Sequence, residues 1–417
     1  MKIKFVSGRQ ILDSRGDPTI ECDVVLDNGI IGRASVPSGK STGKAEALEL
    51  RDKGADYGGK SVEKAINKIN KIIAPIVIGQ NVEDQQQIDN AMIIMDGTSN
   101  KSRLGANAIL AVSMAVCKAA ARTKNLPLWK YISDLADTKP GMPIPMFNVI
   151  NGGAHAGWTT DIQEYMIAPL GNQDFSDDLR IGAEIFHALG EVLEKSKYQT
   201  TVGDEGGYAP QIRNGNNEPM FLIAKAVEAA GYKLGRDVVI TLDVSASAFY
   251  EKGKYKLKTD KKTLTATEMI NWYKNLVKRN YVSSIEDGLA ENDWQGWKEL
   301  TKKLGDKIQI VGDDLLVTNT ELLSRAVSEK AANAILIKPN QIGTVTETLA
   351  TIKLAIASGY GIVISHRSGE TEDTFISHLA VGVGAGQIKA GSLSRGERIA
   401  KYNELLRIEE QMSQLVD

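Results

Sequence analysis

The 417-residue chain has only two cysteines, Cys22 and Cys117, and each lies within an apolar stretch. Two isolated cysteines make neither the close pair of a zinc site nor the framework of a disulfide-stabilised secreted domain. This composition is typical of a protein from a reducing compartment. We therefore predict a cytoplasmic location and leave a secondary presence at the cell surface open.

The chain also lacks a long hydrophobic run and a strong net charge. Its longest apolar segment, "LGANAILAVSMAVC" at residues 104–117, has 14 residues, whereas a membrane-spanning helix needs about 20. The opening residues, "MKIKFVSGRQ", lack the apolar core of a secretory signal. With 50 Lys and Arg against 52 Asp and Glu, the formal charge is −2, which gives no basic field for nucleic acid. We expect a small-molecule ligand and no membrane.

A glycine is missing where a nucleotide-binding loop would need one. The stretch "VPSGKSTG" at residues 36–43 ends like a P-loop, but Ala34 stands at the position of the first glycine of that motif. Pro37 also has no amide hydrogen to offer a phosphate. We therefore predict no nucleotide site and expect a loop whose hydroxyl groups, including that of Ser41, bind substrate or metal.

The segments that are present divide the chain into two parts. The runs "TIECDVVL" and "IIGRASV", joined by "DNG", predict a β-hairpin, and helical patterns extend from about residue 44 to residue 131. The proline-rich stretch "ADTKPGMPIPM" at residues 136–146 indicates a boundary. We predict an α+β domain at residues 1–135, a linker at 136–143 and a second domain at 144–417.

In the second part, six short apolar runs alternate with helical patterns, and each run ends in polar or charged residues. The runs are "VVITLD", "VSSIED", "IQIVGDD", "AILIKP", "GIVISH" and "GQIKAG". From the second run onward, the polar ends lie 23 to 28 residues apart, which is the length of one strand and one helix. In an open α/β sheet only a few strand ends meet, whereas in a (β/α)8 barrel all of them surround one mouth. Six polar strand ends favour the barrel.

Three of these strand ends carry carboxylates, namely Asp243, Glu286 and Asp313. Three negative charges held together are costly unless a cation binds between them, and oxygen ligands alone indicate Mg²⁺ or a similar hard ion. The alternative is that each acid caps the helix that follows it. The occurrence of all three at strand ends favours the metal site.

Basic and hydroxyl side chains end the other strands. Lys338 and Lys389 would lie near the same cation, which favours a general base and a charge-stabilising group. His366, Arg367 and Ser368 follow another apolar run, and a guanidinium beside a hydroxyl suits a phosphate or carboxylate. The alternatives are a pair of structural lysines that neutralise the acids, and a solvated loop.

Two glycine-rich stretches add candidates for proton transfer. "NGGAHAG" contains His155, and "VGDEGG" places Asp204 and Glu205 between flexible residues, as expected of an acid/base pair on a loop. Ordinary turn chemistry would also explain Glu205. The remaining histidines, His187 and His378, lie in helical patterns, where we expect packing or surface roles.

Taken together, these stretches resemble the enolase family over almost the whole chain, from "SRGDPT" to "RIAKYNELLRIEE". The most specific matches are "SGKSTG", "NGGAHAG", "DIQEYMI", "VGDEGG", "SIED", "VGDDL", "IKPNQIGT", "SHRSGETEDTF" and "GQIKAGSLSR". The resemblance implies a modified (β/α)8 barrel of the TIM type, whose second strand runs antiparallel, with an N-terminal α+β capping domain. It also implies the reversible Mg²⁺-dependent dehydration of 2-phosphoglycerate to phosphoenolpyruvate.

The resemblance further implies two metal ions. Asp243, Glu286 and Asp313 are similar to the ligands of a first Mg²⁺. Ser41, in a segment that resembles a closing lid, is similar to a ligand of a second ion that is recruited with substrate. The stretch "VPSGKSTG" thus resembles a lid rather than a nucleotide cradle.

The remaining roles concern proton transfer and substrate binding. Lys338 is similar to the base that removes the C2 proton, and Glu205 to the acid that assists loss of the C3 hydroxide. The other matches imply acid/base support from Glu164 and His366, substrate contacts from His155 and Gln163, a phosphate grip by Arg367 and Ser368, and a carboxylate contact by Lys389.

Some residues depart from the family pattern. Lys40 stands in the lid where a small or apolar residue is usual, and Gly288 replaces a proline just after a metal ligand. Ala248 replaces a glutamate, and Trp158 stands where asparagine is common. None of these is a proposed ligand, so we expect effects on rate, metal affinity or lid movement rather than on the reaction.

Two other functions stay open at this stage. A related barrel could abstract a proton beside a different carboxylate, as racemases and cycloisomerases do, although the lid serine and "SHRSGE" favour a phosphate-bearing acid. Enolases are also associated with RNA-processing assemblies and with plasminogen capture at cell surfaces, and the chain ends "QLVD" without the terminal lysine that capture often uses. The family habit implies a homodimer or an octamer of dimers.

Overall fold

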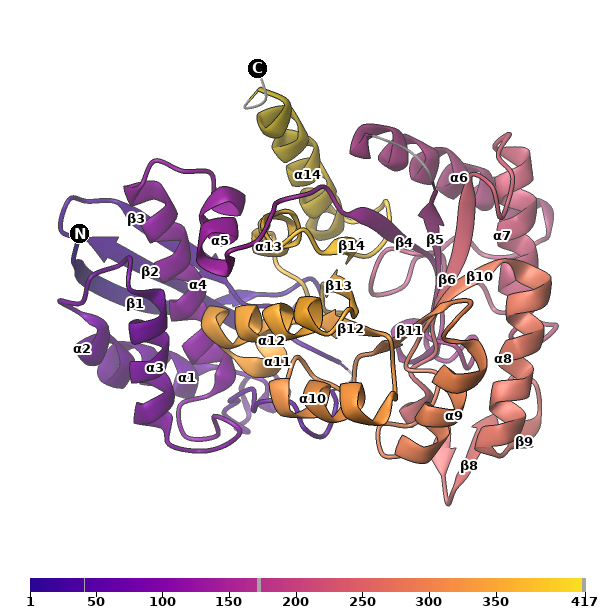
Figure 1. The fold of residues 1–417 in the computed structure, drawn as a ribbon, viewed down its shortest axis with the longest axis horizontal. Helices are drawn as coiled ribbons and strands as arrows, with labels where there is room; N and C mark the ends of the chain where they lie inside the picture. Colours follow the sequence, from indigo (N-terminus) through magenta and orange to yellow (C-terminus); the bar gives the residue numbers. More distant parts are fainter. Residues whose placement is uncertain (41, 171–173, 415–417) are drawn as a thin grey trace.

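The computed structural model describes residues 1–40, 42–170 and 174–414, so Ser41, the expected lid ligand, lies outside the described residues. Figure 1 shows two parts, a smaller one from the first third of the chain and a strand barrel surrounded by helices. No helix within the described ranges is both long and apolar enough to cross a bilayer.

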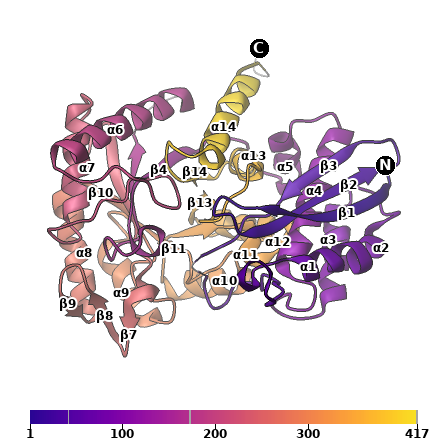
Figure 2. The same cartoon turned by 180° about the vertical axis from the view of Figure 1, so that it is seen from behind.

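The N-terminal part is a three-stranded antiparallel sheet covered by helices. Its strands, in order across the sheet, are β1 (Ile3–Leu12), β2 (Pro18–Leu26) and β3 (Ile31–Ser35), and β2 and β3 form the predicted hairpin. The helices are α1 (Glu63–Lys68), a π-helical turn (Ile69–Ile73), α2 (Ala74–Val77), α3 (Gln85–Asp96), α4 (Ala106–Thr123) and α5 (Leu128–Ala136). Helix α4, which holds most of the longest apolar segment, is largely buried and packs on β2 and β3, beside the sheet seen in Figure 2.

The helical prediction from residue 44 onward is wrong for its first part. Residues 44–55 form no helix, and the first α-helix begins at Glu63. The backbone of this segment binds other elements instead. The Ala47 amide donates to the Gln341 carbonyl at 2.8 Å, and the Ala106 amide donates to the Leu48 carbonyl at 2.8 Å. These tertiary hydrogen bonds decide the conformation over local helix propensity, and the bond to Gln341 fastens the segment to the second part of the chain.

The second part is a closed barrel of eight strands. In order around the barrel they are β4 (Ile144–Asn151), β5 (Glu164–Pro169), β6 (Val238–Asp243), β10 (Val282–Glu286), β11 (Gln309–Gly312), β12 (Ala334–Ile337), β13 (Gly361–Ser365) and β14 (Gly386–Lys389). Strand β5 is antiparallel to both of its neighbours, and the other pairs are parallel. The modified barrel and its reversed second strand are therefore confirmed.

Helices surround this barrel (Figure 1). They are α6 (Phe175–Lys195), α7 (Glu218–Ala229), α8 (Ala266–Asn280), α9 (Trp294–Leu304), α10 (Thr320–Glu329), α11 (Pro339–Ile342), α12 (Val345–Ala357), α13 (Phe375–Gly382) and α14 (Gly396–Gln414). A small sheet of β7 (Tyr250–Glu251), β8 (Lys254–Leu257) and β9 (Lys262–Leu264) follows β6. Helix α5 ends at Ala136, the first residue of the predicted linker, and β4 begins at Ile144, directly after the linker.

The interior of the barrel is layered. One cluster of buried apolar side chains is contributed by strand residues alone, namely Met146, Met166, Ala168, Val239, Val311, Ala334, Leu336 and Val363. Because side chains alternate along a strand, residues an even number of positions away face the same interior. Lys338, for example, lies two positions beyond Leu336, at the end of β12. The apolar cluster therefore forms a floor beneath the polar strand ends.

Candidate active site

The predicted site residues meet at the mouth formed by the C-terminal ends of the parallel strands. Around a cavity of about 270 Å³ lie His155, Gln163, Glu164, Glu205, Asp243, Lys338, Ser365, His366, Arg367, Ser368 and Lys389. Glu286 and Asp313 do not line the cavity, but each contacts a lysine that does. Residues far apart in the sequence are thus brought to one mouth, as the barrel prediction requires.

Lys389, at the end of β14, lies among three buried carboxylates. Its Nζ is 2.9 Å from Asp243 Oδ2, 2.9 Å from Glu286 Oε2 and 3.2 Å from Glu164 Oε1. Burial alone would lower the pKa of this ammonium, but the carboxylates outweigh it and raise the pKa well above the usual lysine value. Lys389 is therefore a fixed positive charge at the mouth.

Glu164 reaches the mouth only because β5 is reversed. It is the first residue of β5 and pairs with Asp243, the last residue of β6. On a parallel strand the first residue would lie at the opposite end of the barrel. The reversal therefore brings Glu164 and the preceding Gln163, whose Nε2 is 3.3 Å from Asp243 Oδ2, to the same mouth as the other strand ends.

Lys338, which follows β12, is paired with the third carboxylate. Its Nζ is 2.5 Å from Asp313 Oδ2, and the Gln341 side chain donates to the other Asp313 oxygen at 2.8 Å. Burial alone would lower the pKa of Lys338, but Asp313 outweighs that effect and raises the pKa above the usual lysine value. Lys338 is thus an ammonium in this arrangement, and it can accept a proton only after Asp313 has another partner.

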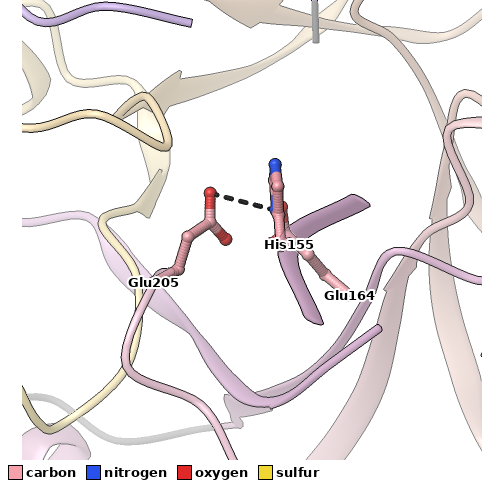
Figure 3. A group of neighbouring side chains, drawn as sticks. All are labelled: His155, Glu164 and Glu205. Atoms are coloured by element: carbon pink, nitrogen blue, oxygen red, sulfur yellow. Dashed lines mark ion pairs between the residues drawn. The ribbon is translucent and has the colours of Figure 1, made fainter. Parts of the chain in front are cut away.

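Glu164 and Glu205 form a second acidic group with His155 (Figure 3). The Nδ1 atom of His155 lies 3.4 Å from Glu205 Oε1 and 3.8 Å from Glu164 Oε1. Burial raises the pKa of Glu164 well above the usual glutamate value, and the Glu205 carboxylate raises it further. Burial also acts on Glu205, but its contacts with His155 and His366 outweigh burial and hold its pKa well below that value. Of the two carboxyls, Glu164 therefore holds a proton more readily than Glu205.

Arg367 and Ser368, which the family resemblance assigns to the phosphate, contact the N-terminal part of the chain. The Arg367 guanidinium contacts Glu46 through two nitrogens, with Nη1 2.9 Å from Oε2 and Nη2 3.3 Å from Oε1. The Ser368 hydroxyl accepts a hydrogen bond from the Lys40 amide at 2.9 Å. A Cβ atom on Gly39 would come within 1.9 Å of Arg367 Nη2, so a larger residue there would have to displace the guanidinium. The start of the expected lid therefore lies directly on the predicted phosphate site.

Family comparisons agree with this geometry. A model described as the enolase N-terminal domain matches residues 3–132, and one described as the enolase C-terminal TIM barrel domain matches residues 139–417. The chain belongs to the enolase family. Its domains are those of a lyase of the enolase superfamily, whose sites use a lysine or histidine base with one or two Mg²⁺ ions.

The acidic residues at the enolase mouth fit a metal ion in their chemistry. Asp243, Glu286 and Asp313 are buried oxygen donors at the ends of neighbouring strands, which suits a hard divalent cation. Of the described residues, the groups whose ligand atoms all lie within 4.8 Å are His155 with Glu164 and Glu205, and Asp287 with Asp313 and Asp314. Asp243 and Glu286 belong to neither group, and the Lys389 ammonium contacts both of them.

Several residues at the mouth were missed by the sequence analysis. Asn148 donates to Glu205 Oε2 at 2.8 Å, and Asp287 accepts from the Asp313 and Asp314 amides at 3.0 and 2.9 Å. Glu46 lay in a segment wrongly predicted as helix. Gln341 and Arg398 stand within the matched stretches "IKPNQIGT" and "RIAKYNELLRIEE". The sequence of such a stretch does not indicate whether its glutamine or arginine side chain is buried.

Proposed function

We propose that this enolase-family protein is a phosphopyruvate hydratase, which interconverts 2-phosphoglycerate and phosphoenolpyruvate in glycolysis and gluconeogenesis. One observation carries the proposal: a single small cavity is lined by the lysine of a proton-transfer site, Lys338, and by the arginine and serine of a phosphate site, Arg367 and Ser368. An acid without a phosphate would leave the buried Arg367 without a role in binding. The match therefore favours a phosphorylated hydroxy acid.

The charges at the mouth suit removal of a proton beside a carboxylate. That proton is a poor acid because its loss makes an aci-carboxylate with two negative charges, so fixed positive charges nearby lower the barrier. Lys389 supplies such a charge and contacts the substrate carboxylate in our proposal. Mg²⁺ bound by Asp243, Glu286 and Asp313, with a second ion recruited with substrate through Ser41, would supply further positive charge where the dianion develops.

Proton transfer is assigned to two opposing groups. Lys338 takes the C2 proton as a neutral amine, after its ammonium has released one proton to solvent and Asp313 contacts a bound cation in its place. The acidic pair Glu164 and Glu205 delivers a proton to the departing C3 hydroxide, which leaves as water. The pKa of Glu164 is raised and that of Glu205 is lowered, so Glu164 is the member of the pair that holds a proton more readily. Removal of either carboxyl should therefore impair the second step.

Substrate contacts come from buried polar atoms that have no partner within the described part of the chain. Both ring nitrogens of His155, Oε2 of Glu164 and Nε2 of His366 are buried and make no hydrogen bond there. Buried polar groups are normally hydrogen-bonded, so such a set at one cavity is typical of a site for a polar ligand. We assign His155 to the substrate on this basis, and Gln163 because its side chain lines the same cavity.

Assembly and location are proposed on family habit alone. We propose a homodimer, or an octamer assembled from dimers, in the cytoplasm, acting on a small phosphorylated acid without a nucleotide. Light scattering of the purified chain would test the assembly. Calorimetry with ATP and Mg²⁺ should give no specific heat of binding.

The decisive experiment follows 2-phosphoglycerate in deuterated buffer with Mg²⁺. The wild-type protein should form phosphoenolpyruvate and exchange the C2 proton. Glu205→Gln should keep some C2 exchange while it loses dehydration, because only the second step needs the acidic pair. If the wild type neither exchanges the proton nor forms phosphoenolpyruvate, the proposed activity is wrong. Exchange on an acid that lacks phosphate would instead favour a racemase-like or cycloisomerase-like reaction.

A further inference from the structure

Arg398, in the first turn of α14, is a charged side chain with no exposed surface. A guanidinium is almost never buried unless its donors are matched by acceptors. This residue is neither a lining residue of the cavity nor a ligand in the family pattern described above. The contacts of the Arg398 guanidinium therefore indicate its role next to the cavity.

The guanidinium ties together the two loops that carry proton-transfer residues. Its Nη1 atom lies 2.6 Å from the Arg367 carbonyl, and its Nη2 atom lies 2.7 Å from the Ser368 carbonyl and 3.1 Å from the Asp204 carbonyl. Its Nε atom is 3.3 Å from a carboxylate oxygen of Glu397, an ion pair without a hydrogen bond between these two atoms. Each of these partners is an acceptor, as a donor-only group requires.

One more contact is chemically selective. Arg398 Nη1 lies 2.6 Å from Nδ1 of His366, and both side chains are buried. Arginine has no acceptor atom and stays protonated in proteins, so it can only donate in this contact. Nδ1 of His366 must then hold a lone pair, and the ring proton must be on Nε2. That nitrogen faces Glu205, with 3.5 Å between Nε2 and Oε1.

We propose that Arg398 is a positioning residue that fixes His366 as the neutral Nε2–H tautomer, so that His366 is a hydrogen-bond donor to Glu205 and does not itself accept the proton. The tautomer follows from the contact alone, whereas its catalytic meaning rests on the proposed function. The present separation is longer than a hydrogen bond, but such contacts commonly shorten when substrate binds.

The electrostatics of the site agree with a neutral ring. Burial lowers the pKa of His366 well below the usual histidine value, and although the Glu205 carboxylate opposes this, the charge of Arg398 reinforces it. A protonated ring would also direct an N–H toward the guanidinium. Glu205 meanwhile receives the Asn148 amide on its other oxygen, at 2.8 Å. Donors on both sides would keep this carboxyl ionised and aligned while His366 keeps its proton.

The inference also changes the expected role of His366. The family resemblance implied acid/base support, which requires a ring nitrogen that can gain or lose a proton. With Nδ1 held by Arg398 and Nε2 already protonated, neither nitrogen is free to take one. Proton transfer is then left to Glu164 and Glu205, and His366 acts on the orientation and charge of Glu205.

The tautomer can be measured directly by NMR of the full-length protein labelled with ¹⁵N-histidine. The chain has four histidines, so loss of one set of signals in His366→Gln assigns the ring. We expect Nε2 of His366 to carry the proton and Nδ1 to behave as an unprotonated nitrogen at pH 7. A proton on Nδ1 in the wild type would overturn the inference, and this measurement does not depend on activity.

Variants separate the chemical role of Arg398 from simple loop clamping. Arg398→Met should populate both tautomers and lower kcat by about 10- to 100-fold, with a smaller change in KM. Arg398→Lys keeps a donor-only group and should restore the Nε2–H tautomer and part of kcat. Arg395 is the matched control, because it binds the carbonyls of Gly203 and Ser14 at 3.4 and 2.6 Å without a contact to the imidazole that the structure records.

The outcomes distinguish this inference from the proposed function. Arg395→Met should leave the His366 tautomer unchanged, and a tautomer change in that variant equal to the change in Arg398→Met would show that loop clamping alone is responsible. A fixed Nε2–H tautomer in a protein that does not dehydrate 2-phosphoglycerate would reject the proposed function but keep the tautomer assignment. Full activity in a protein whose His366 carries its proton on Nδ1 would keep the proposed function but reject the tautomer assignment.

Discussion

The two ends of the barrel differ in size and in chemistry. At the C-terminal ends of the parallel strands a cavity of about 270 Å³ is lined by carboxylates, lysines, histidines and an arginine. At the opposite end a hollow of about 1050 Å³ has a strand lining of neutral residues, among them Ala168, Val239, Gln309 and Gln387. The larger space thus has the less reactive walls.

The difference shows that volume is a poor guide to chemistry in this fold. One apolar layer separates the two ends, and the same strands contribute to both, so the strand interior alone does not decide which end is reactive. We call the cavity at the C-terminal strand ends the upper mouth and the space at the opposite end the lower hollow. The upper mouth differs because the loops after the strands and the N-terminal part add Glu205, His366 and Glu46 to it. Each prediction below therefore pairs a change at the upper mouth with a control or contrast elsewhere.

The largest expected effect is from Lys338→Ala. This change removes the proposed base, so C2 exchange and phosphoenolpyruvate formation should both fall by on the order of 10³-fold or more. The matched control is Lys307→Ala, which removes a lysine from the lining of the lower hollow and should leave both rates within about twofold of wild type. Steady-state rates and deuterium exchange measure the effect. Wild-type exchange by Lys338→Ala would show that the base is another residue.

Metal removal is expected to have the next largest effect. Exhaustive chelation should abolish dehydration, and added Mg²⁺ should restore it, because three buried carboxylates favour a bound cation. Asp313→Ala should weaken Mg²⁺ binding by more than about 100-fold, since even a residue that only supports a ligand is worth 10- to 100-fold. Asp306→Ala, at the lower hollow, should bind Mg²⁺ like wild type in calorimetry. Full activity after chelation would contradict the metal assignment.

The sequence predicted the residues of the upper mouth better than the way they are held. Acids and lysines at strand ends are visible as periodic patterns, since a barrel brings every strand end to one mouth. The reversal of β5 was not visible in the alternation of strands and helices, and it came from the family resemblance alone. Glu46 and Arg398 were missed because burial of a charged side chain depends on partners more than 30 positions away, at Arg367 and His366.

The ion pair between Glu46 and Arg367 should contribute more to stability than a similar pair three residues further along the chain. Both members of the first pair are buried, with side chains 3% and 8% exposed, whereas Arg51 and Glu49 are 18% and 27% exposed. Glu46→Gln leaves a buried guanidinium without its counter-charge and should lower the free energy of unfolding by about 3 kcal/mol. Glu49→Gln should lower it by about 1 kcal/mol or less.

Urea denaturation of the two variants tests this contrast. A shift of the unfolding midpoint that is as large in Glu49→Gln as in Glu46→Gln would show that burial at the mouth does not distinguish the pairs. Addition of 2-phosphoglycerate provides a further check. Without the Glu46 charge beside it, Arg367 attracts an anion more strongly in Glu46→Gln, so the ligand should raise the midpoint of this variant more than that of wild type.

The smallest effect is expected at the lower hollow, where Gln309 donates to Gln387 Oε1 at 2.8 Å and its own Oε1 is buried without a hydrogen bond among the described residues. Gln309→Ala removes one neutral hydrogen bond and leaves Gln387 unpaired, so the unfolding free energy should fall by about 1 kcal/mol. The double variant Gln309→Ala, Gln387→Ala should lose less unfolding free energy than the sum of the two single variants, because the second change removes a group already without its partner.

Dehydration of 2-phosphoglycerate should stay within about twofold of wild type in the two single variants and the double variant, since the apolar layer separates this end from the reactive mouth. A larger loss of kcat with unchanged stability would mean that the lower end is coupled to the chemistry, and the contrast between the two ends would then fail.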